Sequence, residues 1–474
     1  MLLSLSPIIL LVVLLFSAVQ LFGADASYGP NQVALLIASA AAGLVGMYRG
    51  LTWAEVQDSM VAGIRVGLGP ILILLAVGGL IGSWMVAGTV PAMIYYGVSI
   101  LNPSIFFAAA AIICALASIS IGSSWTVAGT LGIGLIGIAD SYGLSPAMAA
   151  GAIISGAYFG DKLSPLSDTT NLAAACTNVD LFAHIRHMLW TTVPAFCLAL
   201  IFFFMIDSGA ATAPEQIAEL RSAISAEFNV GVGVLIPLVV MLGLIWWRVP
   251  AYPAIMLATL AGVLTAVTLQ TAVVEKFALN ANPDATVPLI EGLWRTLFAG
   301  FEGTTSNEEL NRLISKGGIA SMLNTVWLIL SALAFGGVLE RTGILKQILD
   351  AVLKAVKSTG DLVLATVTGG FLTNILAADQ FLAIALPGRL FSSTYDDFRL
   401  SRENLSRTLE DSATMTSALI PWNTCGAYMA ATLGVATFEY APYAIFNIAC
   451  PLIAIAFGYL MFQQKPAEAA TSSA

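Results

Sequence analysis

The chain has 474 residues, of which 58% are hydrophobic and only 10% are charged, whereas roughly a quarter are charged in ordinary soluble domains. With a mean hydropathy of +0.88, this composition excludes a soluble enzyme, a nucleic-acid-binding protein and a disordered chain. The net charge of −9 is spread over many loops and says little about partners. Many uncharged stretches reach the roughly 17–20 residues with which a helix crosses a lipid bilayer. The sequence therefore predicts an all-α, polytopic membrane protein.

Apolar stretches of helix length form two membrane halves joined by a polar linker. We expect the first half at residues 1–206, the linker at 207–229, the second half at 230–462 and a disordered tail at 463–474. Because residues 5–23 follow no basic segment, we interpret them as a membrane helix rather than a removed signal peptide. The predicted spans are 5–23, 31–48, 64–86, 88–101, 104–138, 145–176, 188–206, 230–247, 252–274, 319–340, 343–356, 361–390, 408–434 and 439–462.

Polar interruptions recur at corresponding places in the two halves. Transporters are often built from two repeats of opposite orientation, with broken helices at the interface between the repeats. We therefore predict two inverted-topology repeats with broken helices and re-entrant hairpins. An offset of 256 residues (396 − 140 = 256) places Asp140, Leu144, Ser145, Leu163 and Pro165 on Asp396, Leu400, Ser401, Leu419 and Pro421.

Basic residues predict the orientation, because short cytoplasmic loops are enriched in Lys and Arg. Arg49 and Arg186 mark two such loops, and a basic cluster that runs from Arg389 to Arg407 falls on the same side. The acidic linker falls on the opposite, extracytoplasmic side. Seven crossings in each half satisfy these constraints and place both termini in the cytoplasm. We expect a multi-pass protein of the inner (cytoplasmic) membrane.

The sharpest chemical signal is a polar run within an apolar stretch, residues 156–175. A charge at the centre of a membrane costs at least about 2.5–3.5 kcal/mol, so these charges need compensating contacts. Pro165 breaks the helix and frees carbonyl oxygens, and an oxygen-rich site suits an alkali cation rather than a transition metal. A loop outside the membrane is the alternative. The predicted ion-binding residues are Asp161, Ser164, Ser167, Asp168, Thr169, Thr170 and Asn171, supported by Lys162.

The second half has a counterpart in residues 409–431, around Pro421. We predict a second broken helix here, which either binds another ion or carries a proton. The alternative is an interfacial helix start that Asp411 caps. The candidate residues of this second-half site are Asp411, Thr414, Asn423 and Thr424, together with Asp379 from another interruption.

Two further interruptions face these motifs, one at residues 122–126 and one at residues 373–380. Ser123, Ser124 and Thr126 of the first either support the ion site or serve helix packing, since small polar residues do both in membranes. Asp379 of the second is a functional candidate, because an acid inside a membrane is costly. We find no nucleophile–base pair, metal cluster or phosphate-binding loop in the sequence, so we expect neither an enzyme nor a bound cofactor.

The run Gly-Asp-Lys-Leu-Ser-Pro-Leu-Ser-Asp-Thr-Thr-Asn, residues 160–171, resembles the NhaC family of sodium/proton antiporters. The segments Gly-Ser-Ser-Trp-Thr at 122–126 and Ile-Pro-Trp-Asn-Thr-Cys-Gly at 420–426 extend the likeness over nearly the whole chain. Relatives in that family include a sodium-lactate/malate–proton exchanger. The resemblance implies a scaffold and a transport domain with hairpins, often in a homodimer, and an elevator motion.

The hypothesis that follows is an exchange of sodium for protons across the bilayer. Na⁺ would bind at Asp161, Asp168 and Asn171, and a proton arriving at the same carboxylate would displace it. Lys162 would neutralise the empty site, alternating with the ion. The alternative is a sodium- or proton-coupled carrier of a small organic acid or amino acid. A channel fits less well, because acidic sites on broken helices favour a carrier.

Overall fold

The computed structural model describes residues 2–22, 26, 28–206 and 214–466, and within these ranges it is built of helices without a β-sheet. Eight of the described helices are long and apolar enough to cross a membrane, or up to ten if each of two bent pairs is one span. The predicted all-α, polytopic membrane fold is confirmed. The count is lower than seven per half because several predicted spans are short or broken helices.

In the first half, the helices up to residue 121 agree closely with the predicted spans. Between residues 122 and 177, the predicted spans are divided into shorter helices. A π-helical turn at Ala128–Gly132 joins α7 to α8. The helices are α1 (Leu2–Phe22), α2 (Pro30–Tyr48), α3 (Trp53–Val66), α4 (Leu68–Val86), α5 (Thr89–Ile100), α6 (Phe106–Ile121), α7 (Ser124–Val127), α8 (Ile133–Ser141), α9 (Pro146–Leu163), α10 (Asp168–Thr177) and α11 (Leu181–Met205).

The helices after residue 213 begin inside the predicted linker, where residues 214–227 form a helix. A second π-helical turn lies much later in the chain, at Glu410–Thr414. The helices are α12 (Pro214–Glu227), α13 (Ile236–Trp246), α14 (Ala251–Leu269), α15 (Thr271–Ala281), α16 (Pro288–Phe298), α17 (Glu308–Ile314), α18 (Leu323–Arg341), α19 (Ile344–Leu353), α20 (Thr359–Ala377), α21 (Gln380–Asp397), α22 (Arg402–Leu409), α23 (Met415–Ser417), α24 (Thr424–Leu433), α25 (Thr437–Tyr440) and α26 (Ile445–Tyr459). At ten residues α19 rises only about 15 Å, so it is too short for the crossing expected at 343–356.

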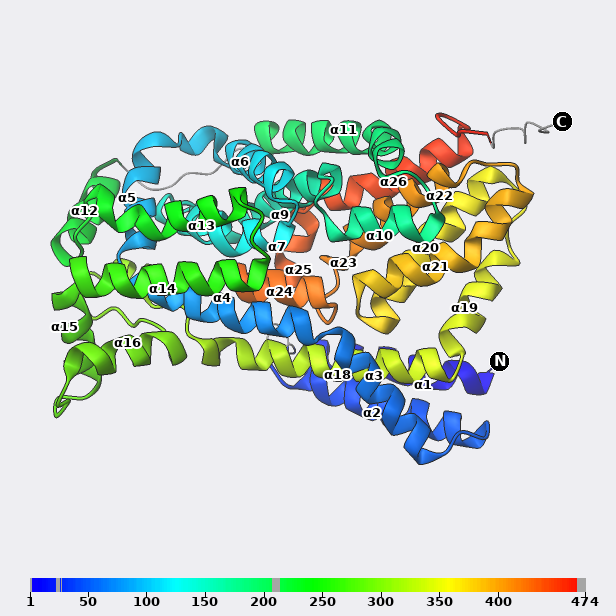
Figure 1. The fold of residues 1–474 in the computed structure, drawn as a ribbon, viewed down its shortest axis with the longest axis horizontal. Coiled ribbons are helices and arrows are strands. Elements are labelled where there is room, and N and C mark those ends of the chain that lie inside the picture. The colour runs from blue at the N-terminus through cyan, green and yellow to red at the C-terminus, as the bar shows by residue number, and fades with distance from the viewer. Residues whose placement is uncertain (1, 23–25, 27, 207–213, 467–474) are drawn as a thin grey trace.

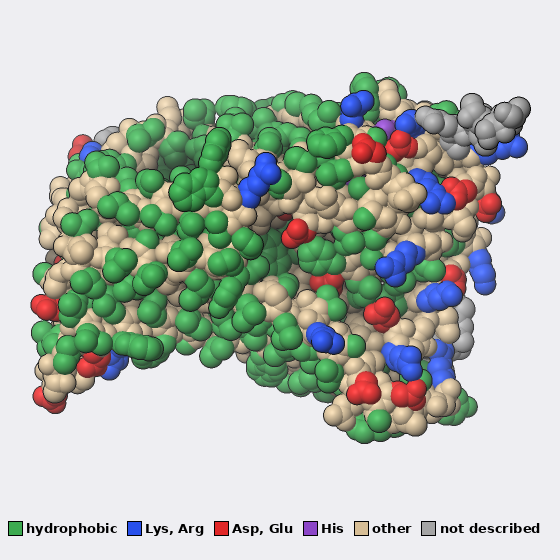
Figure 2. Space-filling model, in the orientation of Figure 1, with side chains coloured by type: hydrophobic (Ala, Val, Ile, Leu, Met, Phe, Trp, Pro, Cys, Tyr) green, Lys and Arg blue, Asp and Glu red, His purple; other side chains and the backbone are tan. Residues whose placement is uncertain are grey.

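The long helices run along the longest axis of the molecule, so its two ends correspond to the two membrane faces (Figure 1). The start of α1 and the end of α26 lie at one end, and α12 lies at the other. Hydrophobic side chains cover much of the visible flank, while most charged side chains of this face gather at the end where α1 starts (Figure 2). This distribution is the one a membrane protein needs, with an apolar flank in contact with lipid.

Two of the helix breaks have the same backbone geometry, 256 residues apart. Gly122, which ends α6, and Ala378, which ends α20, are both left-handed, with φ of 73° and 58°. The next residues, Ser123 and Asp379, are both extended and both cap the following helix. The same offset relates the first residues of α10 and α24 (424 − 168 = 256). These matching boundaries support a repeat; its inverted orientation stays a prediction.

Glycines allow α6 and α9 to cross in backbone contact. A Cβ atom on Gly156 would lie 2.0 Å from the carbonyl oxygen of Ala111, and one on Gly160 would lie 2.3 Å from that of Ala115. The close crossing fixes α9, and with it the polar run at its end, against the break after α6.

We therefore expect Gly156→Ala to destabilise the fold by about 1–3 kcal/mol, because the added methyl group meets backbone that cannot move aside alone. Thermal unfolding in detergent, followed by tryptophan fluorescence, measures the shift. Gly243→Ala in α13 is the matched control, because a Cβ atom there meets nothing within 4 Å. Equal melting temperatures for the two variants would contradict the close crossing.

Candidate functional site

Asp161 lies at the point where the first two helix breaks meet. Its side chain is only 8% exposed, near the end of α9. One carboxylate oxygen, Oδ2, accepts hydrogen bonds from the backbone N–H of Ser124 (3.0 Å) and from its hydroxyl (2.6 Å). The break after α6 thus presents the first residue of α7 to the carboxylate at the end of α9, which gives this acid a fixed position.

A cavity of about 210 Å³ lies against this carboxylate, and we call it the ion chamber. Acid, hydroxyl and amide side chains line one part of it, and apolar residues of α4 line another. The hydroxyls of Ser167 and Thr169 lie 3.1 Å apart. Such a set of oxygen donors suits a hard monovalent cation. The polar residues lining the ion chamber are Ser123, Asp161, Ser167, Asp168, Thr169 and Gln380.

Three other residues of the predicted ion site shape the break between α9 and α10 and do not line the chamber. The Ser164 hydroxyl accepts from the backbone N–H two residues on, at 3.3 Å. The Thr170 hydroxyl donates to the carbonyl of Lys162 (3.1 Å). Asn171 is exposed, and its amide donates to the carbonyls of Pro165 (2.9 Å) and Ser167 (2.8 Å). Direct ion contacts by these three stay predictions.

The polar residues of the break after α6 lie at the ion chamber or directly behind its lining. Ser124 binds Asp161, as described above. Ser123 lines the chamber and caps α7, and its hydroxyl accepts from the backbone N–H (3.3 Å) and the hydroxyl (3.0 Å) of Thr126. Thr126 therefore fixes the position of the Ser123 hydroxyl and does not itself line the cavity.

Lys162 forms an ion pair with Asp411, from the opposite half of the chain, and both side chains are fully buried. Asp411 also accepts from the hydroxyl of Thr191 (2.8 Å), and the Lys162 ammonium lies 3.2 Å from the Cys450 sulfur. The predicted support from Lys162 therefore takes the form of a link between α9 and the π-helical turn after α22. Asp411 lies within the helix and is no interfacial cap.

Glu410 and Arg407 add two buried charges that our sequence prediction missed as site residues. Among the described residues, neither carboxylate oxygen of Glu410 has a hydrogen-bond partner. Thr414 and Thr169 lie beside that carboxylate, and Lys162 and Asp161 are within electrostatic range of it. Arg407, expected in a cytoplasmic loop, is fully buried, and its Nη1 donates to the carbonyl of Gln463 (3.1 Å).

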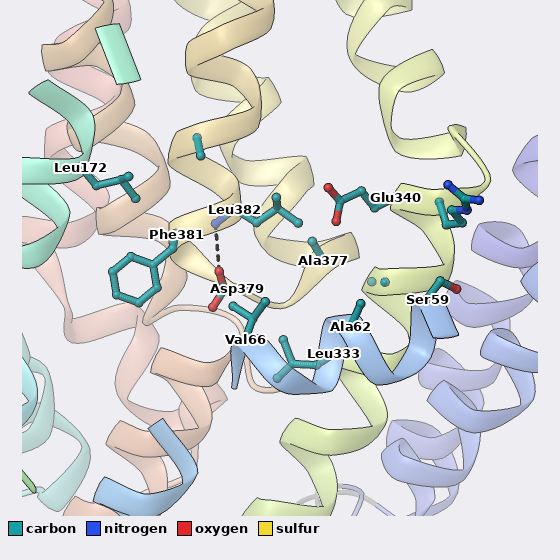
Figure 3. A pocket seen from close by; sticks show the side chains of 15 residues that line it. Ser59, Ala62, Val66, Leu172, Leu333, Glu340, Ala377, Asp379, Phe381 and Leu382 are labelled. Atoms are coloured by element: carbon teal, nitrogen blue, oxygen red, sulfur yellow. Dashed lines mark hydrogen bonds between the residues drawn. The ribbon is translucent and has the colours of Figure 1, made fainter. Parts of the chain in front are cut away.

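Asp379, at the break after α20, does not line the ion chamber, whereas Gln380 and Phe381, the next two residues, do. Asp379 caps α21, since its Oδ1 accepts from the backbone N–H of Leu382 at 2.8 Å, and its carboxylate faces a second cavity (Figure 3). Asn423 caps α24 and donates to the side-chain oxygen of Asn374 (3.0 Å). The backbone N–H of Thr424 donates to the carbonyl of Ala378 (2.9 Å).

The predicted second-half residues therefore fall into separate places. Asp411 belongs to the ion pair with Lys162, and the Thr414 hydroxyl is buried beside Glu410. Asp379 faces the second cavity, while Asn423 and the Thr424 backbone hold the two breaks of the second half together. The described contacts do not unite them in a single site.

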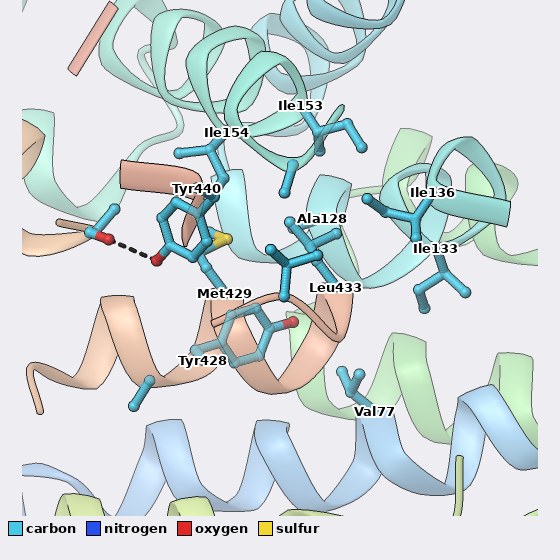
Figure 4. Close-up of a cluster of buried hydrophobic side chains, with 14 of the residues drawn as sticks. Val77, Ala128, Ile133, Ile136, Ile153, Ile154, Tyr428, Met429, Leu433 and Tyr440 are labelled. Carbon is cyan, nitrogen blue, oxygen red and sulfur yellow. Dashed lines mark hydrogen bonds between the residues drawn. The ribbon is translucent and has the colours of Figure 1, made fainter. Parts of the chain in front are cut away.

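Apolar packing joins the second-half break to the first half. Tyr428 and Leu433 of α24 lie among Ala128, Ile133 and Ile153, which belong to the segments after α6 and to α9 (Figure 4). The Tyr428 ring stacks on Trp125, with ring centroids 4.0 Å apart, and its hydroxyl donates to the Trp125 carbonyl (2.9 Å). Trp125 also lines the ion chamber, so α24 supports one of its walls.

The chain is similar to known transporters over most of its length. Residues 156–462 match the model of the Na⁺/H⁺ antiporter family. The Na⁺/H⁺ antiporter NhaC of Alkalihalophilus pseudofirmus is 39% identical over 433 residues, which is 91% of this chain and 89% of that protein. The malate-2H⁺/Na⁺-lactate antiporter of Bacillus subtilis is 37% identical over the same shares. The arginine/ornithine antiporter ArcD of Halobacterium salinarum is 35% identical, over 99% of this chain and 95% of that protein.

Proposed function

The chain belongs to the Na⁺/H⁺ antiporter family, and on that premise we propose that it exchanges sodium for protons, with the ion chamber as the place where the two ions compete. It is a multi-pass membrane transporter and not an enzyme. The observation that carries the proposal is the buried carboxylate of Asp161, which lines a cavity rich in oxygen donors.

Competition follows from the charge of a single carboxylate. When Asp161 is ionised, its negative charge in a low-dielectric site attracts one cation strongly. A bound Na⁺ or a bound proton neutralises that charge, and holding both would leave an uncompensated positive charge. Either ion therefore excludes the other. Exchange results when the site faces the two membrane sides in turn.

The Lys162–Asp411 ion pair keeps both of its charges whether Na⁺ or a proton occupies the ion chamber. Because the pair joins the two halves beside the ion chamber, we propose that it holds their arrangement during turnover. Movement of one bundle against the other, in the elevator manner, and assembly as a homodimer belong to the same proposal. They rest on the family resemblance.

The proposed location is the cytoplasmic membrane, with both termini in the cytoplasm. The start of α1 and the end of α26 lie at the same end of the molecule, and the charged side chains of the visible face gather there. The positive-inside rule supports a cytoplasmic location for that end, although acidic side chains are interspersed.

Proteoliposomes with an imposed pH gradient and a pH-sensitive dye test the function. We expect Na⁺ or Li⁺ to dissipate the gradient without any organic solute, and K⁺ to have little effect. If no cation dissipates the gradient, simple exchange is wrong. A screen of organic acids and amino acids then tests the alternative of solute-coupled transport, which the names of two relatives suggest for those proteins.

Glu410 is the second carboxylate in this proposal, and we propose that it accepts and releases a proton during turnover. Glu410→Gln removes a buried charge whose oxygens have no described hydrogen-bond partner, so we expect the thermal stability to stay the same or rise. Sodium-driven proton release should nevertheless fall at least about tenfold, as is typical when a proton-transfer group is lost. The proteoliposome assay and a melting curve check both parts. Wild-type exchange in the variant would exclude Glu410 from proton transfer.

A further inference from the structure

The second cavity, of about 710 Å³, lies beside the break between α20 and α21, and we call it the vestibule. Residues of α3, α18, α10 and α21 line it (Figure 3). Cavities that bind small organic molecules have volumes of roughly 300–1,000 Å³, are mostly apolar and contain a few polar groups. The vestibule has this size, which far exceeds the space that a lone sodium ion occupies.

A buried acid supplies the main polar group of the vestibule. Asp379 is 2% exposed, and Oδ1 is used to cap α21. The other oxygen, Oδ2, has no hydrogen-bond partner among the residues that the structure describes. A buried carboxylate oxygen without a partner is costly unless a cation or a donor occupies the space in front of it.

The remaining charges of the lining favour a cation. Glu340 adds a second carboxylate. The one basic side chain in the lining, Arg341, forms an ion pair with Glu55 at 3.0 Å. The arginine charge is thus offset by an acid outside the lining, and the two lining carboxylates leave the vestibule negative.

The walls indicate what kind of cation fits. Ala62, Val66, Leu333 and Leu382 present hydrocarbon, and Phe381 presents an aromatic ring beside Asp379 (Figure 3). A bare alkali ion prefers a shell of oxygen ligands, which such walls do not supply. An ammonium group at the carboxylate with an alkyl chain along the walls uses both features, and an aromatic face adds a cation–π attraction.

We propose that the vestibule is a second binding site, distinct from the ion chamber, for a small organic cation: a primary ammonium ion with a short aliphatic chain. Its ammonium binds Asp379, and its chain lies against the apolar walls. Phe381 lines both cavities, so a cation bound here lies next to the ion chamber and hinders the passage of Na⁺. The binding itself does not depend on exchange activity.

Calorimetric titration of the full-length protein in detergent, in a sodium-free potassium phosphate buffer, tests the proposal with n-butylammonium as the probe and 1-butanol as its neutral counterpart. We expect butylammonium to bind and butanol not to. Asp379→Asn keeps a helix-capping side chain and removes the charge, so it should weaken binding at least tenfold while the protein remains folded. Ala62→Phe, which adds a ring to the vestibule wall and leaves the Asp379 charge in place, should weaken binding similarly.

Two controls separate this site from other sources of binding. Asp361→Asn, at the half-buried start of α20 and outside the vestibule lining, should leave butylammonium binding unchanged. Asp161→Asn should also leave it unchanged, because the ion chamber is a different cavity. No binding to the wild type, equal binding of butanol, full binding by Asp379→Asn, or loss of binding in Asp161→Asn would each overturn the proposal. None of these outcomes requires transport. The binding test therefore distinguishes a failure of this proposal from a failure of the proposed sodium/proton exchange.

Discussion

Replacing Asp161 by Asn should abolish sodium/proton exchange while the protein remains folded. The amide keeps the shape of the carboxylate and one oxygen that accepts from Ser124, but it carries no charge. An attraction between unit charges at about 4 Å amounts to about 4 kcal/mol at an effective dielectric constant of 20, which corresponds to a loss on the order of 10³-fold in Na⁺ affinity. Proteoliposome flux and the elution profile of the purified variant measure the two parts.

Asp168→Asn is the matched comparison, because this second acid also lines the ion chamber but is exposed. Solvent screens an exposed charge, so we expect a smaller loss than for Asp161. If Asp168→Asn abolishes exchange and Asp161→Asn does not, the competing carboxylate is Asp168. Normal exchange in both variants would remove the ion chamber from the mechanism.

Replacing Lys162 by Met should destabilise the protein by about 3–5 kcal/mol, which is the typical cost of leaving one member of a buried ion pair without its partner. Asp411 would keep the Thr191 hydroxyl (2.8 Å) and the Cys450 thiol (3.5 Å), and its nearest remaining positive charge would be Arg407, whose Nε lies 3.9 Å from its Oδ2. Thermal or denaturant unfolding in detergent measures the change.

The double variant Lys162→Met/Asp411→Leu provides the control. Because it removes both charges, it should recover most of the lost stability. We expect it to remain impaired in exchange if the pair sets the electrostatic background of the ion chamber. Equal destabilisation by the single and double variants would show that the loss comes from packing rather than from the unpaired acid.

The helix breaks could be predicted from sequence because their causes are local. Gly122 adopts a left-handed conformation that glycine permits without cost, and Pro165 removes a backbone donor. Polar residues inside an apolar run therefore marked the breaks after α6 and within residues 156–175. The placement of Asp161, Ser167, Asp168 and Thr169 around one cavity agrees with their position in that run.

The partners of the charged residues could not be predicted, because they depend on packing between distant segments. Lys162 and Asp411 are 249 residues apart in sequence, and neither motif alone indicates their pairing. From the sequence, Arg407 belongs to a basic cluster that is typical of a cytoplasmic loop. In the structure it lies in α22 and is fully buried by neighbouring segments. Glu410 is next to Asp411 in the sequence, and only the packing of Thr414, Thr169 and Lys162 around its carboxylate indicates that it belongs to the site.

If Na⁺ and a proton compete for the Asp161 carboxylate, as we propose, sodium binding must release protons, and this release can be measured without transport. The purified protein, in a weakly buffered solution with a pH indicator, is titrated with NaCl and, separately, with KCl. We predict that Na⁺ releases protons, that K⁺ releases few, and that Asp161→Asn releases few with either salt. Sodium binding without proton release, or the same release from Asp161→Asn, would contradict the claim.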